Sequence, residues 1–136
     1  MTGSRGIGRV IVVGMALLLV TAACGDDAAA DPDRFCEINA DLNALDDPFD
    51  SSPDAARAIV REGRALLDEA VRVTPDEIRD TVDLAAESFR LFLDFAEAAD
   101  FDPERVSLED VEAAFSAESI AAGEAIDEWA EANCSN

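Results

Sequence analysis

The chain of 136 residues contains no histidine, lysine, tyrosine or glutamine. Without histidine, a Ser-His or Cys-His pair cannot activate a nucleophile, and without lysine neither a Schiff base nor a Ser-Lys pair can form. The sequence also lacks zinc sites built on His or Cys clusters, haem ligation through His, and a glycine-rich phosphate loop. Two paired carboxylates are sufficient for glycoside hydrolysis. However, with 31 acidic residues some pair always lies close together, so a close pair does not indicate this activity. We therefore expect no enzymatic activity, no metal and no cofactor.

Basic residues are also scarce: the chain has ten arginines and 31 acidic residues. Two arginines fall within the first 23 residues and all the acidic residues follow, so the remaining chain has a formal net charge of −23. This charge argues against nucleic acid as a partner, since binding there depends on neutralising phosphates, and against contact with anionic lipid head groups. It predicts a solubilising, self-repelling surface. The alternative is a docking face for a cationic partner or Ca²⁺.

Residues 1–23 have the order of an export signal. Arg5 and Arg9 supply positive charge, an apolar run follows, and three small residues precede Cys24. The apolar run is shorter than the roughly 20 residues of a membrane span. The pattern resembles the lipobox of bacterial lipoproteins, which implies a signal peptide that is cleaved before Cys24 and a lipid on the Cys24 thiol. Two or more acyl chains would anchor the protein stably at the extracytoplasmic face of the cell membrane.

The lipobox departs from its usual form at Thr21, where the family has Leu or another large aliphatic residue. An ordinary signal peptidase would also accept the sequence Thr-Ala-Ala that precedes Cys24. In that alternative, Cys24 is a free terminal thiol and the protein is soluble and secreted.

Two further cysteines, Cys36 and Cys134, remain when Cys24 carries the lipid. An exported domain with two cysteines is expected to join them, and the disulfide would close a loop of about 100 residues. After the leader, the chain then divides into a lipidated cysteine with an acidic tether at 24–33 and one domain at 34–136.

Apolar residues spaced three and four apart predict four helical regions. Serine, threonine and proline mark the later starts at Ser52-Pro53, Thr74-Pro75 and Ser107. The phase of the last region slips between Ser116 and Ser119, which allows a kink or a division into two helices. The expected helices are 33–45, 53 onward, 75–99 and 107–133. Short connections predict an all-α, up-down-up-down four-helix bundle, with Cys36 and Cys134 at the same pole.

Three finer features concern how these helices begin, pair and pack. Thr74 and Glu77 are expected to form a capping box at the start of the third helix. Arg64 and Asp68 are spaced for an ion pair along the second helix. The small residues 121–123 are expected to let another helix approach closely.

The later helical regions hold most of the aromatic side chains, which are expected in the core with Val111: Phe89, Phe92, Phe95, Phe115 and Trp129. The alternative for the phenylalanines is the lining of a pocket for a lipid or another apolar ligand. The alternative for Trp129 is an anchor that binds a partner.

The connection 100–106 has a partial resemblance to a calcium-binding loop. Asp100, Asp102 and Glu104 fall at positions 1, 3 and 5 of an EF-hand-like loop. However, Arg105 stands where the loop needs glycine, and Val111 stands where it needs a bidentate glutamate. The expectation is an ordinary solvated loop without a metal site.

Short motifs at both ends of the domain carry a wider resemblance. They are Phe35-Cys36-Glu37, the run from Thr74 to Ile78, and Ile126, Trp129 and Asn133-Cys134. The chain resembles a loose group of small, uncharacterised lipoproteins and secreted proteins of actinobacterial type, with one cysteine at each end of a helical domain. The resemblance implies an envelope location and a helical fold, but no known activity or catalytic residue.

The sequence therefore favours a lipid-anchored, non-catalytic module that contacts an unknown protein of the cell envelope. A carrier or sensor of an apolar small ligand held between the helices is the alternative. An enzyme ranks third.

Overall fold

The computed structural model describes residues 29–135, and within this range every regular element is a helix. The expected leader, Cys24 and residues 25–28 of the tether lie outside the described residues. No helix within 29–135 is long and apolar enough to cross a membrane. The five α-helices are α1 (Pro32–Asn43), α2 (Pro53–Val73), α3 (Arg79–Ala98), α4 (Leu108–Ala114) and α5 (Ala117–Asn133). Three short 3-10 helices lie in the connections: η1 (Pro48–Asp50), η2 (Asp76–Ile78) and η3 (Pro103–Arg105).

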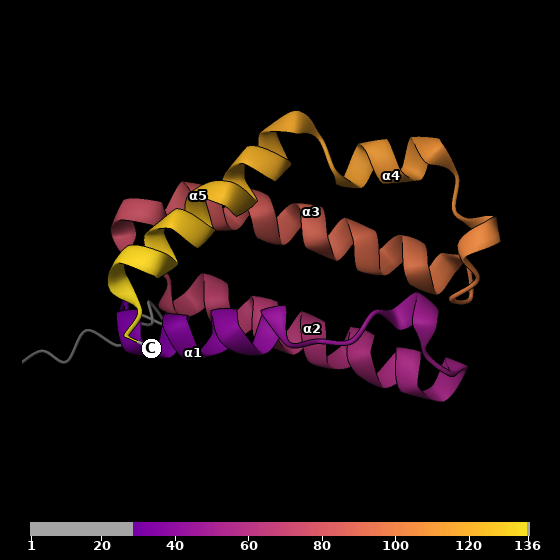
Figure 1. Ribbon diagram of the computed structural model, residues 1–136, viewed down its shortest axis with the longest axis horizontal. Coiled ribbons are helices and arrows are strands. Elements are labelled where there is room, and N and C mark those ends of the chain that lie inside the picture. The colour runs from indigo at the N-terminus through magenta and orange to yellow at the C-terminus, as the bar shows by residue number, and fades with distance from the viewer. Residues whose placement is uncertain (1–28, 136) are drawn as a thin grey trace, which may run out of the picture.

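The helices form two layers (Figure 1). One layer contains α1 and α2, and the other contains α3 with α4 and α5. The expected last helix is divided into α4 and α5, and the break at Phe115 and Ser116 adjoins the phase slip in the sequence. The all-helical prediction is thus confirmed, with five α-helices in the described chain.

Side-chain caps explain where most of the helices begin. Ser52 accepts a hydrogen bond from the Ala55 backbone NH at the start of α2. Ser107 and Asp110 form a capping box on α4, and the hydrogen bonds from Ser107 hold the pKa of Asp110 below its usual value. Ser116 caps α5. These bonds satisfy backbone donors that have no partner within the helix.

The expected capping box at Thr74 is wrong. Thr74 is buried, and its hydroxyl donates to the Ala70 carbonyl at the end of α2. The chain then passes through η2 before α3 begins at Arg79. Glu77 accepts a hydrogen bond from the Trp129 indole NH instead of capping the helix. A hydrogen bond back to α2 on Thr74 and a tertiary hydrogen bond on Glu77 therefore replace the expected cap.

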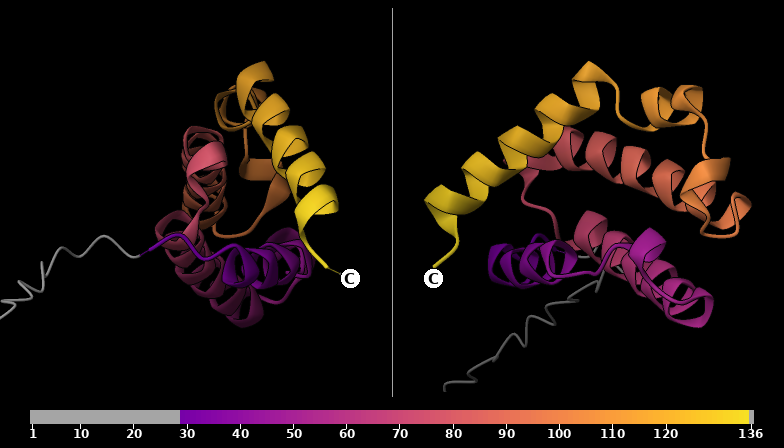
Figure 2. Two further views of the ribbon diagram at one scale, coloured as in Figure 1. Left: turned by 90° about the vertical axis from the view of Figure 1, so that its left-hand side faces the viewer. Right: turned by 45° about the vertical axis from the view of Figure 1, so that its right-hand side comes forward.

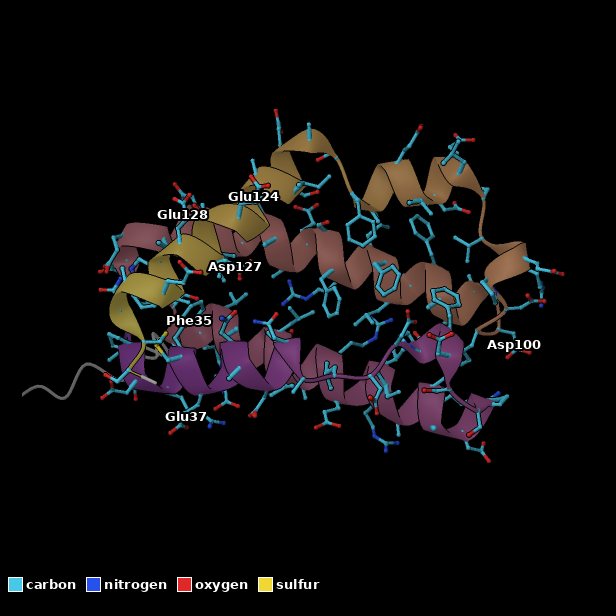
Figure 3. The ribbon with its side chains drawn as sticks, viewed as in Figure 1. Phe35, Glu37, Asp100, Glu124, Asp127 and Glu128 are labelled. Atoms are coloured by element: carbon cyan, nitrogen blue, oxygen red, sulfur yellow. A yellow bond between two sulfur atoms is a disulfide. The ribbon has the colours of Figure 1, made fainter. Side chains whose placement is uncertain are left out.

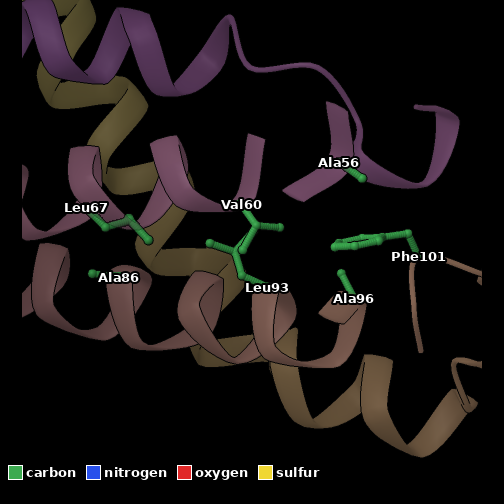
Figure 4. Close-up of a cluster of buried hydrophobic side chains, with 7 residues drawn as sticks. All are labelled: Ala56, Val60, Leu67, Ala86, Leu93, Ala96 and Phe101. Atoms are coloured by element: carbon green, nitrogen blue, oxygen red, sulfur yellow. The ribbon is translucent and has the colours of Figure 1, made fainter. Parts of the chain in front are cut away.

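Two apolar clusters form the core. The first joins α2, α3 and the loop after α3, and is drawn in Figure 4: Ala56, Val60, Leu67, Ala86, Leu93, Ala96 and Phe101. The second lies toward the disulfide and consists of Phe35, Ile38, Ala70, Ile78 and Val82. Trp129 packs on the second cluster, with its ring edge-on to Phe35 at 5.5 Å between centroids. The prediction of Trp129 as a core residue at this pole is confirmed.

Arginine side chains connect neighbouring helices across the surface. Arg64 on α2 bonds both Asp94 and Glu97 on α3, at 2.6 Å each. The expected pair of Arg64 with Asp68 is wrong, because Asp68 bonds Arg90 on α3 at 2.8 Å. Arg64 and Arg90 therefore both join α2 to α3.

One ion pair joins α1 to α2 in a two-bond arrangement. The Nε and Nη2 atoms of Arg34 donate to the two carboxylate oxygens of Glu69, at 2.8 and 3.0 Å. Arg34 also bonds Glu37 one turn along α1. The hydrogen bonds from Arg34 hold the pKa of Glu69 below its usual value.

The disulfide joins Cys36 on α1 to Cys134 at the end of α5, as expected, with 5.6 Å between the Cα atoms. The two cysteines are 98 residues apart in sequence. The bond therefore ties the first helix to the last across nearly the whole described chain.

Replacing both cysteines, Cys36→Ser with Cys134→Ser, should lower the free energy of unfolding by about 2–5 kcal/mol, because the unfolded chain then gains the entropy of an open loop. Denaturant unfolding under non-reducing conditions measures the change. The double variant leaves no new free thiol within the domain. An unfolding midpoint equal to that of the wild type would contradict the prediction.

Glu69→Gln should lower the melting temperature at pH 7, and the deficit should shrink on acidification. The folded-state pKa of Glu69 lies below the ordinary value of 4.5. The stabilisation from the ion pair of Arg34 with Glu69 is therefore present above the pKa that Glu69 has in the unfolded chain. It is lost as pH falls through the pKa that Glu69 has in the folded protein. Thermal melts between pH 7 and pH 3 test this, with the exposed Glu62→Gln as a control for the removed charge. A deficit that is constant with pH would contradict the prediction.

Candidate functional site

A cavity of about 290 Å³ lies between α1, α2, α3 and α5. Its apolar lining comes from all four helices and from the α4–α5 break: Leu42, Leu67, Val82, Phe89, Phe115 and Ile126. Ligand pockets typically measure about 300–1,000 Å³, so this cavity is at the lower end of that range.

The cavity arises from the way α5 is held. α5 packs chiefly on α3, whereas α1 packs chiefly on α2, and the disulfide joins α1 to α5 only at one end. Figure 2 shows that α5 diverges from α1 with increasing distance from its C-terminal end. The space between the two helices is therefore widest away from the disulfide.

Gly123 enlarges this space. It lines the cavity, and a Cβ atom built on it would have no neighbouring atom within 4 Å. The expected close approach of another helix at residues 121–123 is therefore wrong at Gly123, although Ala122 beside it is buried. The missing side chain leaves open volume instead of a helix contact.

Three polar side chains with solvent exposure also line the cavity. Asn39 and Asn43 lie one turn apart on α1, and Asp127 lies on α5. Asn43 and Asp127 are exposed to solvent and Asn39 is half-buried. Within residues 29–135, the side chains of these three residues form no hydrogen bond or ion pair, so all three are available to a ligand.

Two serines lie deeper in the cavity lining and are already bonded. Ser88 donates to the Ala114 carbonyl at the end of α4. Ser119 is buried, and its hydroxyl bonds the carbonyls of Ser116 and Ala114. These hydroxyls fix the break between α4 and α5.

The four expected core phenylalanines divide between two cavities. Phe89 and Phe115 line the first cavity. Phe92 and Phe95 line a second one of about 200 Å³, next to η1, η3 and α4. The rings of Phe92 and Phe115 are 5.5 Å apart, so one aromatic cluster separates the two spaces.

The α4–α5 corner exposes apolar side chains that were expected to face inward. Phe115 is 40% exposed and Val111 is 42% exposed. Leu108 and Ile120 extend this surface, at 74% and 52% exposure. The expectation that Val111 and Phe115 lie in the core is wrong, because the short α4 covers one side of α3 and leaves part of its own apolar face in solvent.

In the acidic connection after α3, Asp100 and Asp102 already have partners within the protein. Asp100 lies 3.6 Å from the Arg57 guanidinium, and Asp102 accepts a hydrogen bond from the Glu104 backbone NH. Asp100 and Phe101 both have positive φ angles, of 54° and 62°, and the buried Phe101 ring packs into the first core cluster. Among the described residues, no group of three or more acidic, cysteine or histidine side chains is placed to hold a metal ion.

The polar residues of the cavity were not anticipated from the sequence. On α1, the apolar positions Ile38 and Leu42 are each followed by an asparagine. This repeat at steps of four was a usable signal, because it puts two amides along one edge of the apolar stripe. Asp127 had no such signal, since acidic residues surround it in α5.

Comparison of the chain with protein-family models, with curated protein sequences and with solved structures finds no match. The function must therefore be inferred from the residues and the geometry of the cavity.

Proposed function

We propose that the described domain is a non-catalytic binding domain that holds a small apolar molecule between α1, α2, α3 and α5. The observation that carries this proposal is the cavity of about 290 Å³ with a mainly aliphatic and aromatic lining. A ligand that binds this cavity in the folded state and not in the unfolded chain would stabilise the fold. The sequence alone favoured protein contact over this function, and the cavity is the reason for which we now prefer ligand binding.

The volume limits the size of the ligand. An engineered apolar cavity of about 150 Å³ binds benzene. The present cavity of about 290 Å³ would take a molecule roughly twice as large, but not a whole two-chain lipid. A single alkyl chain, a small terpenoid-like skeleton or a small aromatic compound fits this limit.

The proposed location is the extracytoplasmic face of the cell membrane, through a lipid on Cys24. The lipobox-like sequence before Cys24 supports it. The described chain enters the domain at the disulfide pole, where the Asp31 backbone NH bonds the Val73 carbonyl. A lipid anchor would then hold this pole near the membrane, within the roughly 30 Å reach of a nine-residue tether.

The proposed architecture is an up-down-up-down bundle in which α4 and α5 together take the place of the fourth helix. The chain course in Figure 1 supports this view, because α4 and α5 return along α3 toward the disulfide. The inclined path of α5 is the departure from a regular bundle that leaves room for the ligand.

Protein contact remains a second candidate function. The apolar corner formed by Leu108, Val111, Phe115 and Ile120 supports it, because side chains of this size are seldom exposed together without a partner. The turn between α4 and α5 lies near the middle of the long axis of the molecule, away from the disulfide pole (Figure 1). On a protein anchored at that pole, the corner would lie clear of the membrane surface and be accessible to an envelope protein.

Native mass spectrometry of the gently extracted full-length protein should detect a bound small molecule in addition to the lipid anchor. Gly123→Leu should abolish this bound mass, because the new side chain would occupy open volume beside the cavity. Gly123→Ala should retain the ligand and raise the free energy of unfolding by about 0.5–1 kcal/mol, since glycine is a poor helix residue.

Ala125→Leu is the matched control, because Ala125 is exposed on the same helix and does not line the cavity. It should keep the bound mass. A clean ligand-free mass in the wild type would reject the ligand-binding function. Crosslinking in intact cells would then test the apolar corner, with Leu108→Asp as the variant expected to lose a partner.

The intact mass of the membrane-extracted protein should show loss of residues 1–23, an added diacylglyceryl group and no free thiol at Cys24. Cys24→Ala should move the protein from the membrane fraction to the medium, because no thiol is left to carry the lipid. Unmodified wild-type Cys24 in the medium would contradict the anchor. The culture medium and the membrane fraction should be analysed in parallel.

A further inference from the structure

The polar part of the cavity lining is negatively polarised. Asp127 is the only charged residue among those that line it in the described structure, and no arginine lines it. Asn39 and Asn43 add two amide oxygens that accept hydrogen bonds, along with their amide NH₂ groups. A ligand that fills the apolar interior would therefore place its polar end beside one carboxylate and two amides.

We propose that the cavity selects an apolar molecule with an ammonium head group, and that the ammonium group lies beside Asp127. This inference rests on the proposed ligand-binding function and adds the chemical class of the ligand. An ammonium group offers hydrogen-bond donors and positive charge, which match the free Asp127 carboxylate and the oxygens of Asn39 and Asn43.

A carboxylate ligand of the same length would be disfavoured. Arg64 and Arg90 both bridge α2 to α3, where each bonds carboxylates of the protein itself. Neither guanidinium lines the cavity. A carboxylate head would therefore meet Asp127 without a compensating cation, and like charges at close range repel.

Asp127 differs in position from the other acids of α5. Figure 3 shows Asp127 on the side of α5 that faces the middle of the molecule, whereas Glu124 and Glu128 lie toward its outer side. Only Asp127 of these three lines the cavity. Substitutions at Asp127 and at an outer acid of α5 can therefore distinguish a direct contact with the ligand from the general attraction of an acidic protein for cations.

The test uses the full chain carrying Cys24→Ala, which avoids detergent, and three probes with one alkyl chain: octylamine, octanol and octanoate. Isothermal titration at about 150 mM salt measures binding, so that long-range attraction is screened. Octylamine should bind at least about fivefold more tightly than octanol, and octanoate should bind most weakly. Asp127→Asn should remove the advantage of octylamine and leave octanol binding unchanged.

Glu124→Gln is the matched control, because it removes one charge from the outer side of the same helix. It should leave the preference for octylamine intact. Equal binding of octylamine and octanol, or an equal loss in the two variants, would overturn the ammonium preference while ligand binding itself stands. Binding of none of the three probes would overturn the ammonium preference together with the proposed ligand function.

Discussion

The disulfide between Cys36 and Cys134 is the constraint on which the arrangement depends, because it holds α5 to α1 at one end only. Beyond that point α5 follows α3 and α1 follows α2. Two helices that are joined at one end and supported by different neighbours must separate along their length. The cavity is the result of this separation, and Gly123 widens it by contributing no side chain.

The apolar spacing and the caps were sufficient to predict the helical class and most helix boundaries, because both act over a few residues. The presence of two remaining cysteines in an exported domain predicted the disulfide. Prediction from the sequence failed where a side chain has another hydrogen-bond partner in the folded chain. Thr74 bonds the Ala70 carbonyl, and Glu77 bonds Trp129, so neither was free to make the expected cap. Arg64 likewise found its carboxylates on α3.

The cavity could not be predicted, since it depends on the angle of α5 and not on any motif. Asn39 and Asn43 were visible as a repeat in the sequence, but only the fold brings Asp127 into the lining of the same cavity. The exposed Val111 and Phe115 have a similar origin. Their spacing predicts an apolar helix face, but spacing does not reveal that α4 would be too short to be covered fully.

Both ends of the described chain lie at the disulfide pole, and the Cys36 and Cys134 Cα atoms are 5.6 Å apart. The loop at 100–106 lies at the opposite pole. A domain with neighbouring termini tolerates circular permutation when the new opening is made in an exposed loop. A short linker between residues 29 and 135, with new termini near Glu104, would open only η3 and preserve α1 to α5, while moving the free ends of the domain to the far side of the molecule.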